Sequence, residues 1–516
     1  MLRILGSPKQ LCAGVSRREM LRAGSLALGS LGLGLGGWND AGLTLGDLLR
    51  GQAAASEGTP ANRPKTFGQA KAVILLHLYG SPSQMETFDP KPESPVEVRG
   101  ELKAIESSLP GCQVCELLPN LAKVMDRTTV IRSLTHPYPL HGVAYALTGV
   151  PAIDVPMELN PHDPRHWPFC GSVVDYLETL REKQNPPKTK RQVPRNVALP
   201  FPFSSRRKGE VPRAGPYAAF LGGEYNPVWT DFVGQATRER VKSLREDTYS
   251  ALDPYLGVND EAHFEVPSAS QLQPDVTLDR LNRRRSLLEQ FDAGRSQMSG
   301  DKAGRQLDRY QQMAFNLLES DKLRTALDLR REPATLRDSY GRTLFGQSCL
   351  AARRMVEAGS KVVTVFWDEY ELAGSGWDTH WDHFPRMKEE LCPGLDQAWF
   401  GLINDLDQRG MLDDTLVICT SEHGRTPKLK TDRGGGRDHW SRVYSALMAG
   451  AGVARGRVVG ASDRQGGLVA DSPCSPKDML ATMYHLLGID HHTILYDALT
   501  RPLPLVDGRL LHEVLG

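Results

Sequence analysis

Apolar runs that alternate with helical segments constrain this 516-residue chain more than any other feature. Residues 72–78, 361–367 and 414–421 are nearly continuous apolar runs, each of the length of one strand. Residues 346–358 and 394–409 suit helices. A strand that is apolar on both sides must be covered on both faces. The alternation therefore predicts a doubly wound α/β fold, in which helices sandwich a mostly parallel sheet.

The rest of the chain adds smaller elements and two less regular regions. Residues 128–134 and 443–448 are further candidate strands, and residues 476–487 are a candidate helix. Residues 160–275 are rich in proline, arginine and aromatic residues, and they predict irregular excursions from the sheet with one short helix near 172–181. Apolar residues at helical spacing over residues 276–332 predict a helical insertion.

Residues 1–55 differ in character and read as a targeting segment. Arg17-Arg18 precedes a glycine-rich apolar stretch, residues 21–36, and small residues follow at 53–55. This is the pattern of a twin-arginine (Tat) signal with its cleavage region, and a retained signal anchor is the rival interpretation. The stretch is too short and too rich in glycine for a stable transmembrane span. We expect export by the Tat translocase to the periplasm or the cell exterior, and a single α/β domain over residues 56–516.

Charge and cysteine content narrow the classes of function. The 62 basic and 62 acidic residues cancel to a net charge of zero, which gives no electrostatic argument for nucleic acid or an anionic membrane as partner. Cys112 and Cys115 form a lone Cys-x-x-Cys, without the second pair that a zinc ribbon requires. We expect a local disulfide or two ordinary thiols there, and a redox role for the pair is the weakest of our hypotheses.

Carboxylates and histidines follow the predicted strands in the last third of the chain. Asp378 and His380 come after one strand, Glu422 and His423 directly follow the next, and His439 comes a short loop later. Ligands bind beyond the carboxyl ends of the strands in open parallel sheets, so these side chains should converge on one edge. Such mixtures are the usual ligands of Zn²⁺ and related ions in hydrolytic sites. A purely structural hydrogen-bonding role is the alternative.

Five stretches carry a more specific signal: residues 80–92, 351–359, 376–380, 421–427 and 436–440. In them the chain resembles exported bacterial proteins that are filed as a domain of unknown function and placed near the sulfatases, within the alkaline-phosphatase superfamily. The similarity covers nearly the whole chain after the signal, and the Tat signal fits it. The resemblance implies an alkaline-phosphatase/sulfatase-like fold.

The superfamily resemblance also implies a two-metal site. Glu422 and His423 stand where the superfamily has an Asp-His pair. Asp378 and His380 match its second cluster, and His439 matches its final histidine. Residues 141–149 resemble the stretch that follows the nucleophile in sulfatases, and His141 holds the nucleophile's position.

The sequence departs from the superfamily pattern at the first strand and at the nucleophile. Tyr79, Gly80 and Ser81 stand where a metal-binding aspartate normally ends the first strand. A Cys-x-Pro-x-Arg sequence is absent, so a formylglycine nucleophile is not supported. Ser81 or Ser83 could replace His141 as the nucleophile, although a serine in a Gly/Pro turn is more often a turn residue. The count stays open between two ions, one ion and none.

Two functions follow from these residues. The first is an exported hydrolase of sulfate or phosphate esters that depends on a divalent metal (Zn, Mn or Ca) and acts on a small-molecule or polysaccharide ester. Arg425 and Arg437 would hold the anionic group bidentately, and a structural ion pair is the alternative for each. The second is a non-catalytic, sulfatase-like binding or structural protein of the cell envelope, which the departures favour.

Overall fold

The strand at residues 72–78 is the centre of the fold in the computed structural model. β1 (Ala72–Leu78) is buried along its whole length and lies between β11 (Val362–Trp367) and β12 (Thr415–Thr420), parallel to both. Its alternate side chains enter two different hydrophobic cores, with Ile74 in one and Val73 in the other. This two-sided burial explains the unbroken apolar run and confirms that the sheet is covered on both faces.

Eight strands form the central sheet, in the order β16-β4-β15-β12-β1-β11-β5-β6. The five strands not yet located are β4 (Thr129–Leu134), β5 (Asn196–Leu199), β6 (Val228–Trp229), β15 (Tyr444–Ala449) and β16 (Arg457–Val459). Most neighbours are parallel, as predicted, but β15 runs antiparallel to both β12 and β4. The chain returns from β12 to β15 without a crossover helix, and such a connection yields an antiparallel pair.

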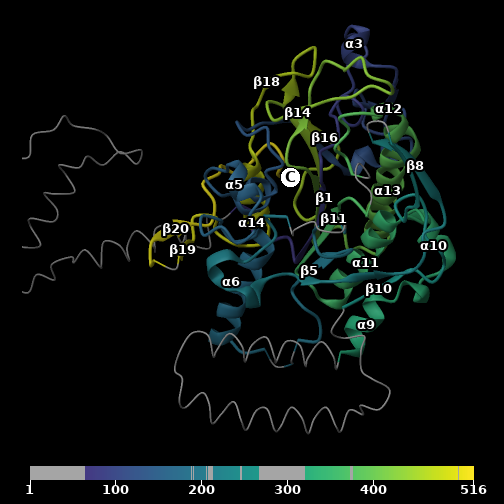
Figure 1. The fold of residues 1–516 in the computed structure, drawn as a ribbon. Coiled ribbons are helices and arrows are strands. Elements are labelled where there is room, and N and C mark those ends of the chain that lie inside the picture. The colour runs from purple at the N-terminus through teal and green to yellow at the C-terminus, as the bar shows by residue number, and fades with distance from the viewer. Residues whose placement is uncertain are drawn as a thin grey trace, which may run out of the picture. The chain divides into compact units, whose positions relative to one another are not determined.

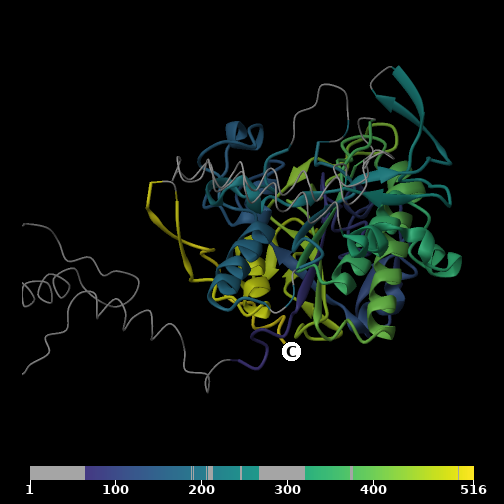
Figure 2. The ribbon, with the colours of Figure 1, turned by 90° about the horizontal axis from the view of Figure 1, so that it is seen from below.

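Helices cover both faces of the sheet (Figure 1 and Figure 2). α11 (Leu344–Ala358) and α13 (Cys392–Gln408) pack into the core of one face. α6 (Cys170–Gln184) and α14 (Pro476–Leu486) pack into the core of the other. All four helices confirm predicted ones, with ends displaced by a few residues. The doubly wound α/β fold class is therefore confirmed.

The structure describes residues 64–187, 189, 191–204, 206, 213–244, 247–266, 320–371, 376–497 and 499–516. The predicted Tat signal and most of the predicted helical insertion lie outside these residues. Within them, no helix combines the length and the apolarity that crossing a membrane requires.

The remaining elements are short. The other helices are α3 (Val96–Arg99), α4 (Val143–Thr148), α5 (Val155–Glu158), α9 (Asp321–Leu327), α10 (Ala334–Ser339) and α12 (His383–Arg386), with tighter or wider turns at η2 (Leu121–Arg127), η3 (Ala219–Leu221), η4 (Gly223–Tyr225), η5 (Leu329–Arg331) and η6 (Met387–Leu391). Two-stranded sheets pair β2 (Ala104–Glu106) with β3 (Gln113–Cys115), β7 (Asp231–Val233) with β10 (His263–Glu265), β8 (Glu239–Leu244) with β9 (Asp247–Leu252), β13 (Gly424–Arg425) with β14 (His439–Trp440), β17 (Ala461–Ser462) with β18 (Val469–Asp471), and β19 (Ile494–Tyr496) with β20 (Pro502–Pro504).

The cysteines in the described part of the chain are buried free thiols, seven in number. Cys112 and Cys115 are among them, so the local disulfide that we considered is wrong. Burial raises the pKa of Cys115 to about 12, which keeps the thiol protonated and unreactive at neutral pH. The redox hypothesis for this pair loses its support.

Candidate metal centre

Four parallel strands end at the edge of the sheet where the predicted ligands meet. Asp378 and His380 lie in the loop after β11, and His423 lies three residues beyond the end of β12. His141 lies between β4 and α4, and His439 opens β14, where it pairs with Arg425 of β13. Segments that are up to three hundred residues apart in the sequence therefore contribute to one site.

Two glycines allow the loops to approach one another. Gly80, after β1, has a φ of 92°, and a Cβ at this position would lie 2.4 Å from the backbone nitrogen of Asp378. A Cβ on Gly436 would lie 2.1 Å from the carbonyl oxygen of His380. A side chain at either position would displace a loop that carries a candidate ligand.

His423 supplies the clearest sign that an ion belongs here. Its Nδ1–H donates to the carbonyl oxygen of Gly424 at 2.8 Å, since a carbonyl oxygen can only accept. Its Nε2 is buried and has no hydrogen-bond partner among the described residues. Burial lowers the pKa of His423 well below its ordinary value, so the ring is neutral and Nε2 carries a lone pair. Burying a lone pair without a hydrogen-bond donor destabilises the fold, unless the lone pair binds a ligand such as a metal ion.

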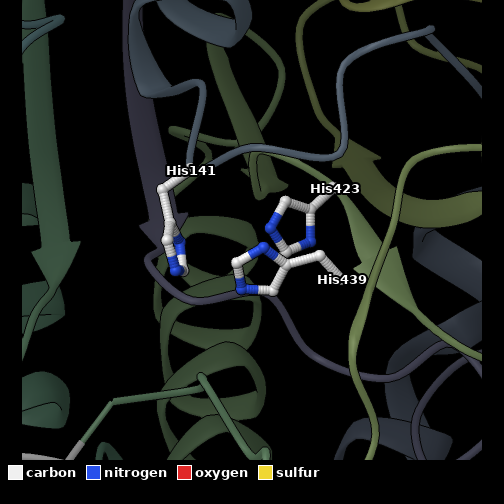
Figure 3. A group of neighbouring side chains, drawn as sticks. All are labelled: His141, His423 and His439. Carbon is white, nitrogen blue, oxygen red and sulfur yellow. The ribbon is translucent and has the colours of Figure 1, made fainter. Parts of the chain in front are cut away.

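His141 and His439 lie against His423 (Figure 3). The ring centroids of His141 and His439 are 4.3 Å apart, and those of His423 and His439 are 4.5 Å apart. His141 donates its Nδ1–H to Glu422 Oε1 at 3.0 Å, and His439 directs its Nδ1 at the carbonyl oxygen of Pro139 at 3.4 Å. In each ring, Nε2 is the nitrogen that remains for the shared space.

Asp378 is the carboxylate at the centre of this group. Its Oδ1 lies 3.0 Å from His380 Nε2 and 3.2 Å from His439 Nε2, and its Oδ2 lies 3.5 Å from His141 Nε2. Arg425 Nη2 donates to Oδ1 at 2.5 Å. Burial raises the pKa of Asp378, but the Arg425 charge and the histidine hydrogen bonds outweigh it and hold the pKa well below its usual range. The carboxylate is therefore ionised at neutral pH.

His380, which is partly exposed, also directs Nδ1 at an oxygen acceptor and Nε2 toward the other candidate ligands. Its Nδ1–H donates to Asp438 Oδ1 at 2.6 Å, and Lys430 Nζ lies 2.5 Å from the same oxygen. Its Nε2 lies 3.1 Å from His439 Nε2. Two nitrogens that both carry lone pairs would repel at this distance, so a cation or a proton must stand between them.

The four histidines thus share one arrangement. Each directs Nδ1 at an oxygen acceptor, either a carboxylate or a backbone carbonyl, and each turns Nε2 toward the other ligand atoms. Two overlapping groups have ligand atoms that all lie within 4.8 Å of one another: His141, His423 and His439, and Asp378, His380 and His439. Oxygen acceptors that orient imidazole ligands are the usual surroundings of protein metal ions. These residues fit a divalent metal.

Comparisons with known proteins identify the chain at the level of its family. Residues 70–515 match the family described as "Protein of unknown function (DUF1501)". The chain belongs to this family. Among curated proteins, none matches this DUF1501 chain.

Solved structures resemble the DUF1501 chain only distantly. A sulfatase from Pseudoalteromonas sp. is 13% identical, with 86% of this chain and 70% of that chain covered and a TM-score of 0.33. A phosphonate monoester hydrolase of Agrobacterium radiobacter is 12% identical, with 86% and 77% covered and a TM-score of 0.31. The lipoteichoic acid synthase LtaP from Listeria monocytogenes is 11% identical, with 85% and 78% covered and a TM-score of 0.29.

Glu422 is the predicted ligand that the structure places apart from both ligand groups. Its side chain is fully buried behind His141, and its Oε1 accepts hydrogen bonds from the backbone N–H of Gly80 at 2.8 Å and from His141 Nδ1. Its Oε2 lies 3.3 Å from His77 Nε2. The carboxylate thus contacts the histidine that we predicted as the nucleophile.

The predicted substrate-binding arginines are fully buried. Arg425 donates to the carbonyl oxygens of Ser81, Trp377 and Arg437 as well as to Asp378. Arg437 donates to the carbonyl oxygens of Thr426, Pro427 and Val98 and to Glu86. Both guanidinium groups therefore brace the loops from inside, as in the structural alternative, and substrate binding by these arginines stays a prediction.

The two candidate nucleophilic serines are also buried. Ser81 Oγ accepts a hydrogen bond from the backbone N–H of His423 at 3.1 Å, and its φ of 73° is strained for a residue with a side chain. Ser83 Oγ is enclosed and has no hydrogen-bond partner in the described part of the chain. Ser81 thus holds the loop that carries His423, and neither serine belongs to the two ligand groups.

Two residues near the ligands were not among the predicted site residues. His77 is the one polar residue of the β1 run, and that break in an apolar strand was the available signal. Asp438 directly precedes His439 in a motif that we had noted. Glu86 lies 3.2 Å from His383 Nε2, and neither residue belongs to the two ligand groups.

Proposed function

We propose that this chain is an exported, metal-dependent hydrolase of sulfate or phosphate esters. The observation that supports it is the set of four imidazoles whose Nδ1 atoms are directed at oxygen acceptors and whose Nε2 atoms gather around Asp378. His141, His423, His439, His380 and Asp378 would hold the ion or ions. A bound divalent ion supplies positive charge to the non-bridging oxygens of an anionic ester and acts as a Lewis acid.

The chemistry of the donors favours a first-row transition metal. Four nitrogens and one carboxylate suit Zn²⁺ best; Mn²⁺ prefers more oxygen ligands, and Ca²⁺ takes six or more of them. His439 belongs to both ligand groups, but its single Nε2 lone pair can serve only one ion. Asp378 has two oxygens, one beside His380 and His439 and the other beside His141. It could therefore bridge two ions.

The site is open on the side that a substrate would use. The side chains of Asp378, His380 and His439 are each about a quarter exposed, while His423 behind them is fully buried. A dianionic or monoanionic ester group would meet positive charge there, and its leaving group, small molecule or polysaccharide, would extend into solvent.

A non-catalytic, sulfatase-like binding protein is the second candidate. It is favoured by the burial of Ser81 and Ser83 and by the internal hydrogen bonds of Arg425 and Arg437. Such a protein would bind a sulfated or phosphorylated ligand at the same centre without turnover.

Assays with aryl sulfates and aryl phosphates separate the two candidates. The hydrolase should cleave at least one of these classes, should require Zn²⁺ or Mn²⁺, and should lose activity in the Asp378→Ala variant. Folded, metal-loaded protein that cleaves neither class would support the binding protein.

Export is the remaining part of the proposal, and it rests on the Arg17-Arg18 pattern alone. The protein should be found in the periplasm or the medium after expression in a bacterium with a Tat system. Replacement of both arginines by lysine should retain it in the cytoplasm. Equal export of the two forms would contradict the assignment.

A further inference from the structure

Glu422 has a different environment from the residues that would hold an ion. It is fully buried: the Gly80 N–H and His141 Nδ1 donate to its Oε1, and His77 Nε2 lies 3.3 Å from its Oε2. His77 belongs to the central strand β1, and its ring meets Phe203 and Phe366 edge-on, while those two rings stack on each other. The carboxylate is therefore held against the central strand β1 and the loop that follows it.

The hydrogen bond to Glu422 decides which nitrogen His141 can offer. A carboxylate can only accept, so Nδ1 of His141 must carry the proton and donate it. The only lone pair that the neutral ring can present is then on Nε2, which lies 3.5 Å from Asp378 Oδ2. The Tyr79 ring stacks on the imidazole with centroids 4.9 Å apart, and this contact restricts rotation of the ring.

We infer that Glu422 is a positioning residue and that His141 is a metal ligand, whereas the sequence predicts a metal ligand at Glu422 and the nucleophile at His141. His141 Nε2 cannot coordinate an ion and attack a substrate at the same time, because it has one lone pair. His141 is therefore not the covalent nucleophile. The inference rests on the proposed function only in requiring that the centre binds a divalent ion.

Metal titration of purified full-length protein tests the inference without an activity assay. Zn²⁺ alone is added to chelator-treated protein in competition with a chromophoric chelator, and X-ray absorption counts the imidazole ligands. His141→Ala should weaken the tightest site by more than about 100-fold and remove one imidazole from the count. Glu422→Leu should weaken it by about 10- to 100-fold without changing the ligand count at saturation. Glu422→Gln keeps an acceptor oxygen for His141 Nδ1–H, so most of the affinity should return.

Glu86→Leu is the matched control, since Glu86 is an equally buried carboxylate beside a histidine that belongs to neither ligand group. It should leave the Zn²⁺ affinity within about threefold of wild type, a smaller shift than the loss of a residue that orients a metal ligand causes. His141 is partly exposed, so His141→Ala should fold even if a Glu422 variant does not. Circular dichroism in the presence of chelator verifies that each variant is folded.

The outcomes distinguish this inference from the proposed function. If wild-type protein binds Zn²⁺ and His141→Ala binds it equally well with the same imidazole count, the inference is wrong and the metal centre stands. A phosphate or sulfate group found on His141 by mass spectrometry after turnover would also overturn it. If folded wild-type protein binds neither Zn²⁺ nor Mn²⁺, the proposed function and the inference both fail. If metal binding behaves as expected but no ester is cleaved, the inference holds and the hydrolase proposal fails.

Discussion

The molecule contains two buried glutamate–histidine pairs at the same edge of the sheet, and they differ in what the histidine has left to offer. His383 Nε2 lies 3.2 Å from Glu86 Oε2 and its Nδ1 lies 2.8 Å from the Thr379 hydroxyl, so each of its nitrogens faces a side chain of the protein interior and neither faces a candidate ligand. His141 uses only Nδ1 on Glu422, and its Nε2 faces Asp378 and two more imidazoles.

The glutamates of the two pairs are electrostatically alike. Burial raises the pKa of each, but their partners outweigh it: Arg437 and His383 hold the pKa of Glu86 at about 2, and the hydrogen bonds of His141 and His77 hold that of Glu422 well below its ordinary value. A buried ion pair and a perturbed pKa therefore do not separate architecture from function here. What separates the two pairs is whether the second nitrogen of the histidine faces the other candidate ligands.

The largest effect is expected at Asp378, where His141 of the Glu422–His141 pair meets the other candidate ligands. Asp378→Ala removes the carboxylate that His141, His380 and His439 share, and it leaves the buried Arg425 without its charge partner. Metal affinity should fall by more than about 100-fold, and ester hydrolysis should fall to the background rate. Titration with Zn²⁺ and assays with aryl esters measure the two effects. Wild-type affinity in the folded variant would mean that the histidines bind the ion without it.

Glu86→Leu should affect stability and spare the metal. It removes the partner of the fully buried Arg437, and breaking a buried ion pair in this way costs about 3–5 kcal/mol. Denaturant unfolding of chelator-treated protein measures the loss. A large fall in Zn²⁺ affinity with little change in stability would contradict this and show that Glu86 supports the metal centre.

Acid should weaken the Glu86–His383 pair, because it protonates the Glu86 carboxylate. Because its folded pKa of about 2 lies below the ordinary value of 4.5, its contribution is complete above the ordinary value and is lost as the pH falls toward the folded value. The stability difference between wild type and Glu86→Gln should therefore shrink by about 2 kcal/mol between about pH 5 and about pH 3. Unfolding curves of both proteins at several pH values measure this difference in stability. A difference that stays constant with pH would contradict the lowered pKa of Glu86.

The smallest effect is expected at Asp438. It accepts the Nδ1–H of His380 as Glu422 accepts that of His141, but half of its side chain is exposed and Lys430 shares it. Water can replace an exposed acceptor, so Asp438→Asn should lower Zn²⁺ affinity only a few-fold, less than Glu422→Leu does. Equal losses in the two variants would show that burial of the acceptor does not matter.

Local sequence pattern was sufficient to predict the scaffold. The apolar run of β1 and the helical spacing of α11, α13 and α14 located these elements to within a few residues, because strand and helix periodicities are local properties. β5 was missed because four residues carry too little periodicity to stand out in a proline-rich region. The antiparallel direction of β15 depends on the path of the chain after β12, which periodicity does not encode.

The candidate site could be predicted in its members but not in their roles. Placement after strands brought together Asp378, His380, His423 and His439, whose convergence follows from the parallel strands. Whether Arg425 or Glu422 faces the open site or the interior depends on loop geometry, such as the left-handed turn at Gly80. Those contacts join residues hundreds of positions apart, and no spacing in the sequence reports them.

Elemental analysis tests the central claim, that the histidine cluster and Asp378 hold a divalent metal, most directly. Protein purified from its producing cells, and protein equilibrated with Zn²⁺ or Mn²⁺ and then desalted, should retain at least about one equivalent of metal, as a structural or catalytic site with this donor set does. The folded double variant His423→Ala, His439→Ala should retain none. Folded wild-type protein without metal after both treatments would contradict the account.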